Sequence, residues 1–143
     1  VYKRYADVPA RYRLSQHEAE YRGRDVWQEF LDKELLAKER SERYRQDVHR
    51  VGRYWKEHLD DRGTHHALAK PADVDAWCAW LLEDRNLGTV YLDYWAKLER
   101  FYDWLLYHPD HPHCYNPVLM AALEGKSASR VWEQKVNRRE KYG

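Results

Sequence analysis

Apolar side chains recur every three or four residues in successive segments of the chain. The clearest stripe consists of Tyr44, Val48, Val51, Trp55 and Leu59, which share one face of a helix at 100° per residue. No segment shows the alternation of apolar and polar residues that indicates a half-buried strand. The pattern therefore predicts an all-α fold, with four main helices packed as a bundle and an extra basic helix at the C-terminal end.

Residues that favour helix ends mark where these helices begin and end. We expect helices from Asp25 to about Ala37, from Ser41 to Gly63, from Pro71 to Leu82 and from Thr89 to about Leu105. Asp25, Ser41 and Thr89 are expected N-caps, Pro71 suits a first turn, and Gly63 suits a left-handed C-terminal cap. A short helix is predicted from Val118 to Leu123. Ser127 or Ser129 is expected to cap a last helix that reaches about Lys141.

Three regions follow from this pattern. Residues 1–24 are polar and irregular and are expected to form an N-terminal tail with a short helical turn after Ser15. Residues 25–125 form the helical domain, and residues 126–143 form a basic C-terminal helix or linker. The chain begins without Met and ends after a basic stretch, so we interpret it as a piece of a longer protein.

The composition limits the core and the partners. Aromatic residues make up 15% of the chain, with 7 Trp and 12 Tyr, so we expect a core built largely from rings. Charged residues make up 34%, but the net charge is only +1. No overall field therefore favours nucleic acid, and any basic surface must come from local sorting of charges.

Cysteine content and hydropathy bear on the compartment. Cys78 and Cys114 are the two cysteines, and Cys78 lies in an apolar helical run that indicates a core position. The chain has no apolar run near the ~20 residues of a membrane span. We therefore expect a cytoplasmic protein without a membrane partner, and no disulfide framework.

Basic residues gather on the outer faces of two expected helices. Opposite the apolar stripe of the second helix lie Arg43, Gln46, Arg50 and Arg53. The outer face of the fourth helix carries Thr89, Asp93, Ala96, Lys97 and Arg100. Side chains at this spacing can reach successive phosphates or base edges in a major groove. The simpler interpretation is a solvated outer face.

The order of motifs resembles the N-terminal core-binding domain of tyrosine recombinases, the phage integrase family with a SAM-like helical bundle. The opening helix is matched by "DVWQEFLDKEL" and the second, which in the family starts with Ser followed three on by Thr or Tyr, by "SERYRQDVHRVGRYWKEHL". The third is matched by "KPADVDAWCAWLLED", the fourth by "LGTVYLDYWAKLERFYDWLLYH", and the Asn-Pro that commonly follows by Asn116-Pro117. The resemblance covers about Asp25 to Pro117.

This resemblance implies a DNA-binding domain of a site-specific recombinase, localised at the nucleoid. Such a domain grips one side of a recombination site in double-stranded DNA, together with its own catalytic domain and other protomers of the synaptic complex. The implied contacts are Ser41, Arg43, Gln46 and Arg50 on the second helix and Thr89, Asp93, Lys97 and Arg100 on the fourth. The helical pattern adds Arg53.

Catalysis is not expected in this chain. The resemblance implies a later catalytic domain with a His-x-x-Arg motif, and that motif does not occur here. The basic residues near the C-terminus, such as Arg130 and Lys135, resemble the start of an interdomain linker, although a solubilising tail explains them equally well. We predict no catalytic residues and no cofactor.

The sequence leaves alternatives to DNA binding. A helical module for protein–protein interaction would expose Trp80 and Trp104, which fall off the main stripes of their helices. A metal-dependent hydrolase would use His108, His111, His113 and Cys114, which are zinc ligand types. Their spacing matches no zinc motif, so we predict no metal site and interpret this loop as a solvated turn stiffened by prolines.

Overall fold

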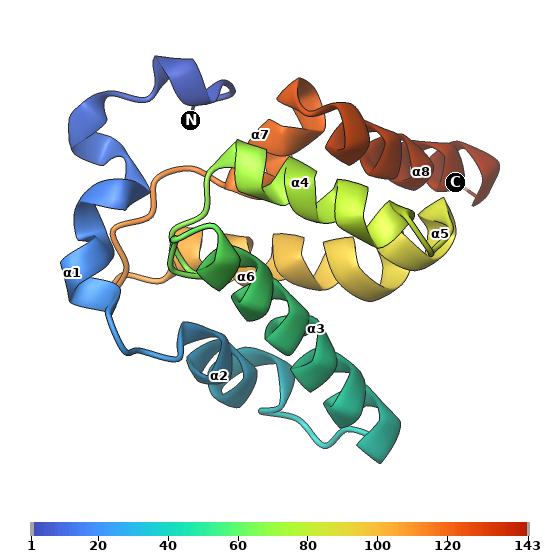
Figure 1. Cartoon of the computed structure of the whole chain (residues 1–143). Coiled ribbons are helices and arrows are strands. Elements are labelled where there is room, and N and C mark those ends of the chain that lie inside the picture. The colour runs from blue at the N-terminus through green and yellow to red at the C-terminus, as the bar shows by residue number, and fades with distance from the viewer. Residues whose placement is uncertain (1, 143) are drawn as a thin grey trace.

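Helices account for the regular structure of the chain, as the apolar spacing predicts. The computed structural model describes residues 2–142, with side chains up to residue 137, and this part contains no strand. The main helices are α2 (Val26–Phe30), α3 (Glu42–Asp61), α4 (Pro71–Leu82), α6 (Ala96–Tyr107), α7 (Pro117–Glu124) and α8 (Lys126–Tyr142). Figure 1 shows α3 and α4 at the front of the bundle, with α7 and α8 packed beside α4.

Shorter helical segments complete the chain. A π-helical segment, η4 (Leu31–Leu35), continues α2, so the first predicted helix is confirmed to within two residues. The fourth predicted helix consists of α5 (Leu87–Thr89), the π-helical η5 (Val90–Trp95) and α6, joined without a break in helical backbone angles. Before α2, the structure has η1 (Tyr5–Asp7), η2 (Ala10–Tyr12), η3 (Leu14–His17) and α1 (Glu18–Tyr21).

Aromatic rings from several helices form the centre of the core. The ring centroids of Trp55 and Trp77 lie 5.0 Å apart at an interplanar angle of 65°. Trp27 and Phe101 approach to 5.0 Å as well. Edge-to-face and tilted contacts at these distances add roughly 0.5–1.5 kcal/mol per pair to the burial of apolar area. The predicted ring-rich core is therefore confirmed, and Cys78 is buried within it.

The cap of the fourth helix differs from the prediction. The side-chain oxygen of Asn86 accepts a hydrogen bond from the Thr89 backbone N–H at 2.9 Å, so the helix starts at Leu87 and Thr89 lies inside its first turn. The prediction that Thr89 is the N-cap is therefore wrong. Asp25 and Ser41 are confirmed as caps, because they accept from the N–H groups of Gln28 and Tyr44 at 3.1 Å each.

The last helix is capped by a residue from another helix. Asp75 of α4 accepts hydrogen bonds from the backbone N–H groups of Ser127 and Ala128 at 2.9 and 2.8 Å. Its carboxylate leaves no space for a side chain at residue 125, since a Cβ on Gly125 would overlap it. The predicted caps Ser127 and Ser129 are therefore wrong, because a tertiary contact supplies what a local side chain was expected to supply.

Residues 2–24 pack against the core and do not behave as a free tail. Val8, Leu14 and Tyr21 are each at most 2% exposed, and the Leu14 N–H donates to the Tyr115 hydroxyl at 2.9 Å. Figure 1 shows this segment running along one side of the bundle. Its backbone is irregular, as expected. The polar composition gave no indication that Val8, Leu14 and Tyr21 would be buried against the core.

The loop after α6 is buried at two of its histidines but exposed at Pro109, Asp110 and Pro112, so the predicted solvated turn is correct only in part. His111 and His113 are 8% and 5% exposed. Tyr21 and His111 form a hydrogen bond between the hydroxyl and Nδ1 at 2.5 Å, and His113 Nε2 lies 2.6 Å from the carbonyl oxygen of Ala67. The N-terminal segment covers this loop, so a sequence that looks polar becomes part of the interior.

Gly52 allows α2 and α3 to approach closely. A Cβ at this position would overlap the indole ring of Trp27, and the Trp27 Nε1–H donates to the Val48 carbonyl at 3.1 Å. The glycine, which costs about 1 kcal/mol in a helix relative to Ala, is therefore retained for packing. This confirms that the stripe of α3 faces the core beside the first helix.

Candidate nucleic-acid interface

Two predicted contact residues, Arg50 of α3 and Lys97 of α6, lie close together on the surface where α3 meets η5. An Arg50 Nη2 atom is 3.2 Å from Asp47 Oδ1, and Lys97 Nζ donates to the Asp93 carbonyl at 3.2 Å. Burial lowers the pKa of Lys97, Asp93 and Asp47 oppose that shift, and the charge of Arg50 adds to it. Lys97 thus shares its surroundings with residues from both helices.

Arg50 remains firmly cationic in this position. Burial by itself would lower its pKa, but contacts with the hydroxyl of Tyr94 and with the Asp47 carboxylate raise it. Tyr94 belongs to η5, so the Arg50–Tyr94 contact ties α3 to the fourth helix. The surface therefore holds one fixed guanidinium and one half-buried ammonium group.

A third cation, Arg85, lies against a group of aromatic rings beside this pair. The Arg85 Cζ atom is 5.2 Å from the ring centroid of Tyr94, 5.6 Å from Trp80 and 5.9 Å from Tyr54. These distances are typical of cation–π contacts. Sequence reasoning missed Arg85 because it follows α4 in a turn and belongs to no helical stripe.

The other predicted residues of α3 lie along its exposed side. Arg43 and Arg53 are exposed, and the Arg53 guanidinium lies 5.4 Å from the Tyr54 ring centroid. Gln46 is exposed and donates weakly to Glu42 at 3.4 Å. The Ser41 hydroxyl is used as the N-cap, although it can still offer its own proton to a phosphate.

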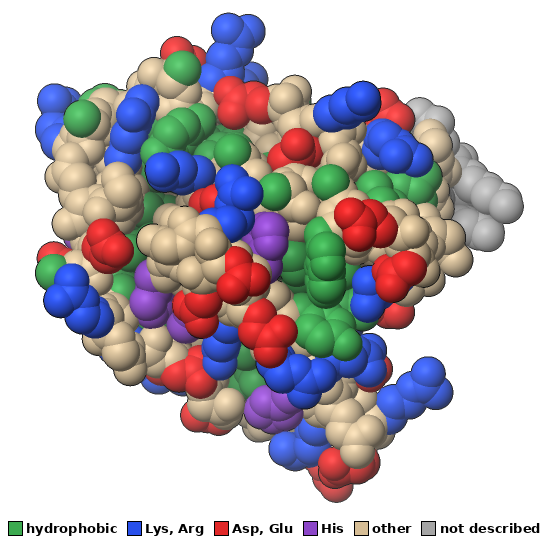
Figure 2. All heavy atoms as spheres, viewed as in Figure 1, with side chains coloured by type: hydrophobic (Ala, Val, Ile, Leu, Met, Phe, Trp, Pro, Cys, Tyr) green, Lys and Arg blue, Asp and Glu red, His purple; other side chains and the backbone are tan. Residues whose placement is uncertain are grey.

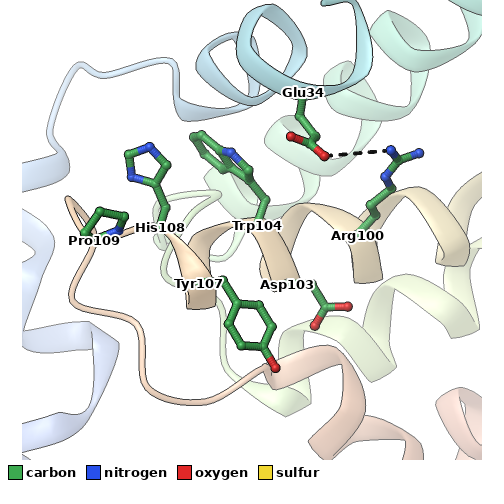
Figure 3. A pocket seen from close by; sticks show the side chains of 7 residues that line it. All are labelled: Glu34, Arg100, Asp103, Trp104, Tyr107, His108 and Pro109. Carbon is green, nitrogen blue, oxygen red and sulfur yellow. Dashed lines mark ion pairs between the residues drawn. The ribbon is translucent and has the colours of Figure 1, made fainter.

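The predicted residues of the fourth helix do not all belong to this surface. Thr89 is half-buried and Asp93 is exposed. Arg100 points towards Glu34 of η4, with 3.9 Å between nitrogen and oxygen. Figure 3 shows this pair at a pocket of about 380 Å³ that also contains Asp103, Trp104 and Tyr107. Arg100 thus has a partner on the first helix, which the spacing could not reveal.

The surface carries both signs of charge. Figure 2 shows Lys and Arg side chains next to Asp and Glu, around hydrophobic side chains exposed near the centre of the view. Asp47 and Asp93 lie among the predicted cations, so the basic character is local. We define the basic surface as the set of five cations Arg43, Arg50, Arg53, Arg85 and Lys97.

Other functional classes find little support within the described residues. Among them, no group of three or more His, Cys, Asp or Glu side chains is arranged to hold a metal ion, so the histidine loop offers no such site there. Within the same part of the chain, no helix has both the length and the apolar content that crossing a bilayer requires.

No protein-family model, curated protein or solved structure matches this chain. Its function must therefore be inferred from the motif order between Asp25 and Pro117 and from the geometry of the basic surface.

Proposed function

We propose that this chain is the core-binding domain of a site-specific tyrosine recombinase that grips one side of a recombination site in duplex DNA. In this proposal the chain itself is not catalytic, and the parent enzyme acts in the cytoplasm at the nucleoid. Its partners are double-stranded DNA, its own catalytic domain and other protomers. The resemblance of the helical motifs supports the family in this proposal, and the basic surface supports the choice of binding face.

The observation that carries the proposal is the meeting of Arg50 and Lys97 from two helices far apart in the sequence. Burial is the main cause of the lowered pKa of Lys97, and repulsion by the nearby charge of Arg50 adds to it. A phosphate between the two cations would relieve that repulsion and release condensed counterions. Asp47 lies near both cations and Asp93 near Lys97, so a phosphate would have to compete with these two carboxylates for the pair.

The neighbouring side chains supply groups suited to the major groove. An exposed helix such as α3 fits a groove about 12 Å wide, where Arg reads guanine and Gln reads adenine by paired hydrogen bonds. Arg43 and Gln46 are exposed on α3 and would approach base edges, while Arg50 and Lys97 would contact phosphates. Thr89 and Asp93 would border the contact on the fourth helix, and Arg100 would join only by leaving Glu34.

Duplex binding by the isolated chain tests the proposal. We expect modest affinity at low salt and a steep loss as salt rises, by about 0.9 in the log–log slope for each phosphate neutralised. The triple variant Arg43→Gln, Arg50→Gln and Lys97→Gln should weaken binding by about 10- to 100-fold and, with two phosphate contacts removed, reduce the salt slope by about 2. Fluorescence anisotropy of a labelled duplex, at a series of salt concentrations, measures both quantities.

A matched control separates site-specific loss from loss of general charge. Lys3, Arg11 and Arg22 are exposed on the N-terminal segment, and changing all three to Gln removes the same charge. Equal loss of affinity in both triple variants would overturn the proposed surface. No salt-sensitive binding at low ionic strength by a folded chain, checked by circular dichroism, would overturn DNA binding itself.

A second candidate is a helical module for protein–protein interaction without DNA binding. It is favoured by one observation, the exposure of large aromatic side chains: Trp80 is 43% exposed and Tyr107 is 81% exposed. Trp104, by contrast, is half-buried against Phe30 at 5.6 Å. A dimer in light scattering, combined with no affinity for duplex DNA, would favour this candidate.

A further inference from the structure

A small pocket lies at the C-terminal end of α3, beside the basic surface but with the opposite charge. Its volume is about 180 Å³, and it is lined by Tyr54, Glu57, His58, Asp61 and Trp80. Ligand pockets for drug-sized molecules span roughly 300–1,000 Å³, so this one suits a single side-chain head group. It lies between α3 and α4, which pack against each other.

Two rings form an aromatic corner in this pocket. The ring centroids of Tyr54 and Trp80 are 5.8 Å apart and their planes meet at 85°, and Trp80 is 43% exposed. Cations bind to the faces of such rings, with Trp the strongest partner. The pair already contacts guanidinium groups of this chain: Arg85 lies 5.6 Å from the Trp80 centroid and 5.9 Å from that of Tyr54, and Arg53 lies 5.4 Å from that of Tyr54.

The charged groups of the pocket are two carboxylates, which only accept hydrogen bonds. Glu57 and Asp61 are exposed carboxylates four residues apart on α3, and neighbouring like charges of this kind weaken a helix. Asp61 also lies at the helix C-terminus, where the dipole disfavours an anion. Their placement does not serve the stability of α3, and a bound cation would relieve both penalties.

His58 adds a neutral acceptor to the pocket. Burial lowers the pKa of His58, so the ring is uncharged at neutral pH. Its Nε2 lies 3.0 Å from the Asp73 carbonyl and must donate to it, which leaves Nδ1 as a lone-pair acceptor.

Two cations near the pocket already have carboxylate partners, whereas Arg53, one turn before Glu57 on α3, lies over the Tyr54 ring. Arg62 pairs with Asp73 at 2.6 Å and Arg85 with Asp84 at 2.7 Å. Among the side chains of residues 2–137, no Lys, Arg or His nitrogen lies within 4.0 Å of a carboxylate oxygen of Glu57 or Asp61. The acidic side of the pocket is therefore uncompensated within the described part of the chain.

We propose that this pocket binds an arginine side chain of a basic protein partner. The flat guanidinium would lie on the Trp80 face and donate to Glu57 and Asp61, in the paired geometry that arginine forms with carboxylates. A phosphate is excluded by the same two carboxylates. The inference goes beyond DNA binding, because it assigns a protein contact to the acidic end of α3.

Nuclear magnetic resonance of the whole chain tests this inference with defined probes. The probes are acetyl-arginine amide and a glycine-flanked acetylated peptide containing two arginines, and the reporter is the Trp80 indole N–H signal, assigned from a Trp80→Phe variant. We expect a saturable shift with millimolar affinity for the amide and at least fivefold tighter binding of the peptide. Acetyl-glycine amide at equal concentration should produce no shift.

The carboxylates are tested by a variant that keeps the shape of the pocket. Glu57→Gln with Asp61→Asn should weaken arginine binding at least fivefold, whereas Glu39→Gln with Glu133→Gln, which changes two carboxylates elsewhere, should leave it unchanged. No saturable shift of the Trp80 signal would overturn the inference, as would equal affinity in both double variants. Duplex affinity, measured in parallel on the same variants, distinguishes this result from failure of the DNA-binding proposal.

Discussion

The basic surface and the histidine-rich interior contain similar kinds of nitrogen-bearing side chains but hold them in opposite charge states. Arg50 is charged as every arginine is, and Tyr94 and Asp47 raise its pKa further. His66 and His113 lose theirs, because burial lowers their pKa values to about 3 and about 4. Burial therefore keeps these histidines neutral well below pH 6.5, whereas the arginines of the basic surface stay charged and can attract an anion.

The two regions also differ in what they contribute to folding. His66 Nε2 accepts from the backbone N–H groups of Val26 and Trp27 at 3.1 and 3.2 Å, so a neutral imidazole completes the start of α2. The exposed arginines of the basic surface cap no helix and fill no core. We therefore expect the interior to control stability and the surface to control binding.

Lowering the pH should have the largest effect on stability, and it should act through the interior. The unfolded chain protonates its histidines near pH 6.5, while folded His66 and His113 stay neutral down to pH values of about 3 and about 4. The unfolded state therefore binds more protons below pH 6.5. The free energy of unfolding must then decrease as the pH decreases. Between pH 7 and pH 5 we expect a loss of about 3–4 kcal/mol.

Urea unfolding at pH 8, 7, 6 and 5, at constant salt, measures this loss. A free energy of unfolding that stays constant from pH 8 to pH 5 would contradict the neutral interior. Two histidines that are neutral when folded and protonated when unfolded must make the free energy of unfolding depend on pH.

The substitution His66→Phe should have the next largest effect and sharpen the comparison. The ring is kept, but the N–H groups of Val26 and Trp27 lose their acceptor, which costs about 1–3 kcal/mol at pH 8. The variant should also lose part of the acid sensitivity of the wild type. Urea unfolding at pH 8 and pH 5 gives both values, and His49→Gln, at an exposed position of α3, is the control that should change neither.

Removing exposed arginines should have the smallest effect on stability. Arg43→Ala with Arg53→Ala takes away two surface cations, and we expect a change in the free energy of unfolding of less than about 1 kcal/mol. The same variant should bind duplex DNA more weakly. A large loss of stability with unchanged DNA affinity would reverse the roles assigned to the two regions.

Particular residues show how far local patterns reach. The stripe from Tyr44 to Leu59 predicted α3 correctly, and Asp25, Ser41, Gly63 and Pro71 marked helix ends where the structure has them. These signals are local, because spacing and capping depend on neighbours within one or two turns. Asn86 was missed because Thr89, three residues on, is also a favoured capping type.

The candidate site was predictable only in part for the same reason. Helical spacing placed Arg50 and Lys97 on outer faces, but it contains no information on which outer faces meet. Arg85 lies in a turn and reaches the aromatic rings only because α4 packs beside α3 and η5. Arg100 belongs to an outer face by the same spacing, yet Glu34 of another helix turns it towards the pocket shown in Figure 3.

The sequence alone determined the all-helical class, the apolar faces and most helix ends, since these follow from contacts within a few residues. The packing of the whole chain determined that the segment of residues 2–24 covers the histidine loop, that Asp75 caps α8, and that an acidic aromatic pocket adjoins the basic surface. Each of these three features brings together residues from separate segments of the chain. Such contacts depend on how the whole chain packs, and the spacing of residues within one helix contains no information on that packing.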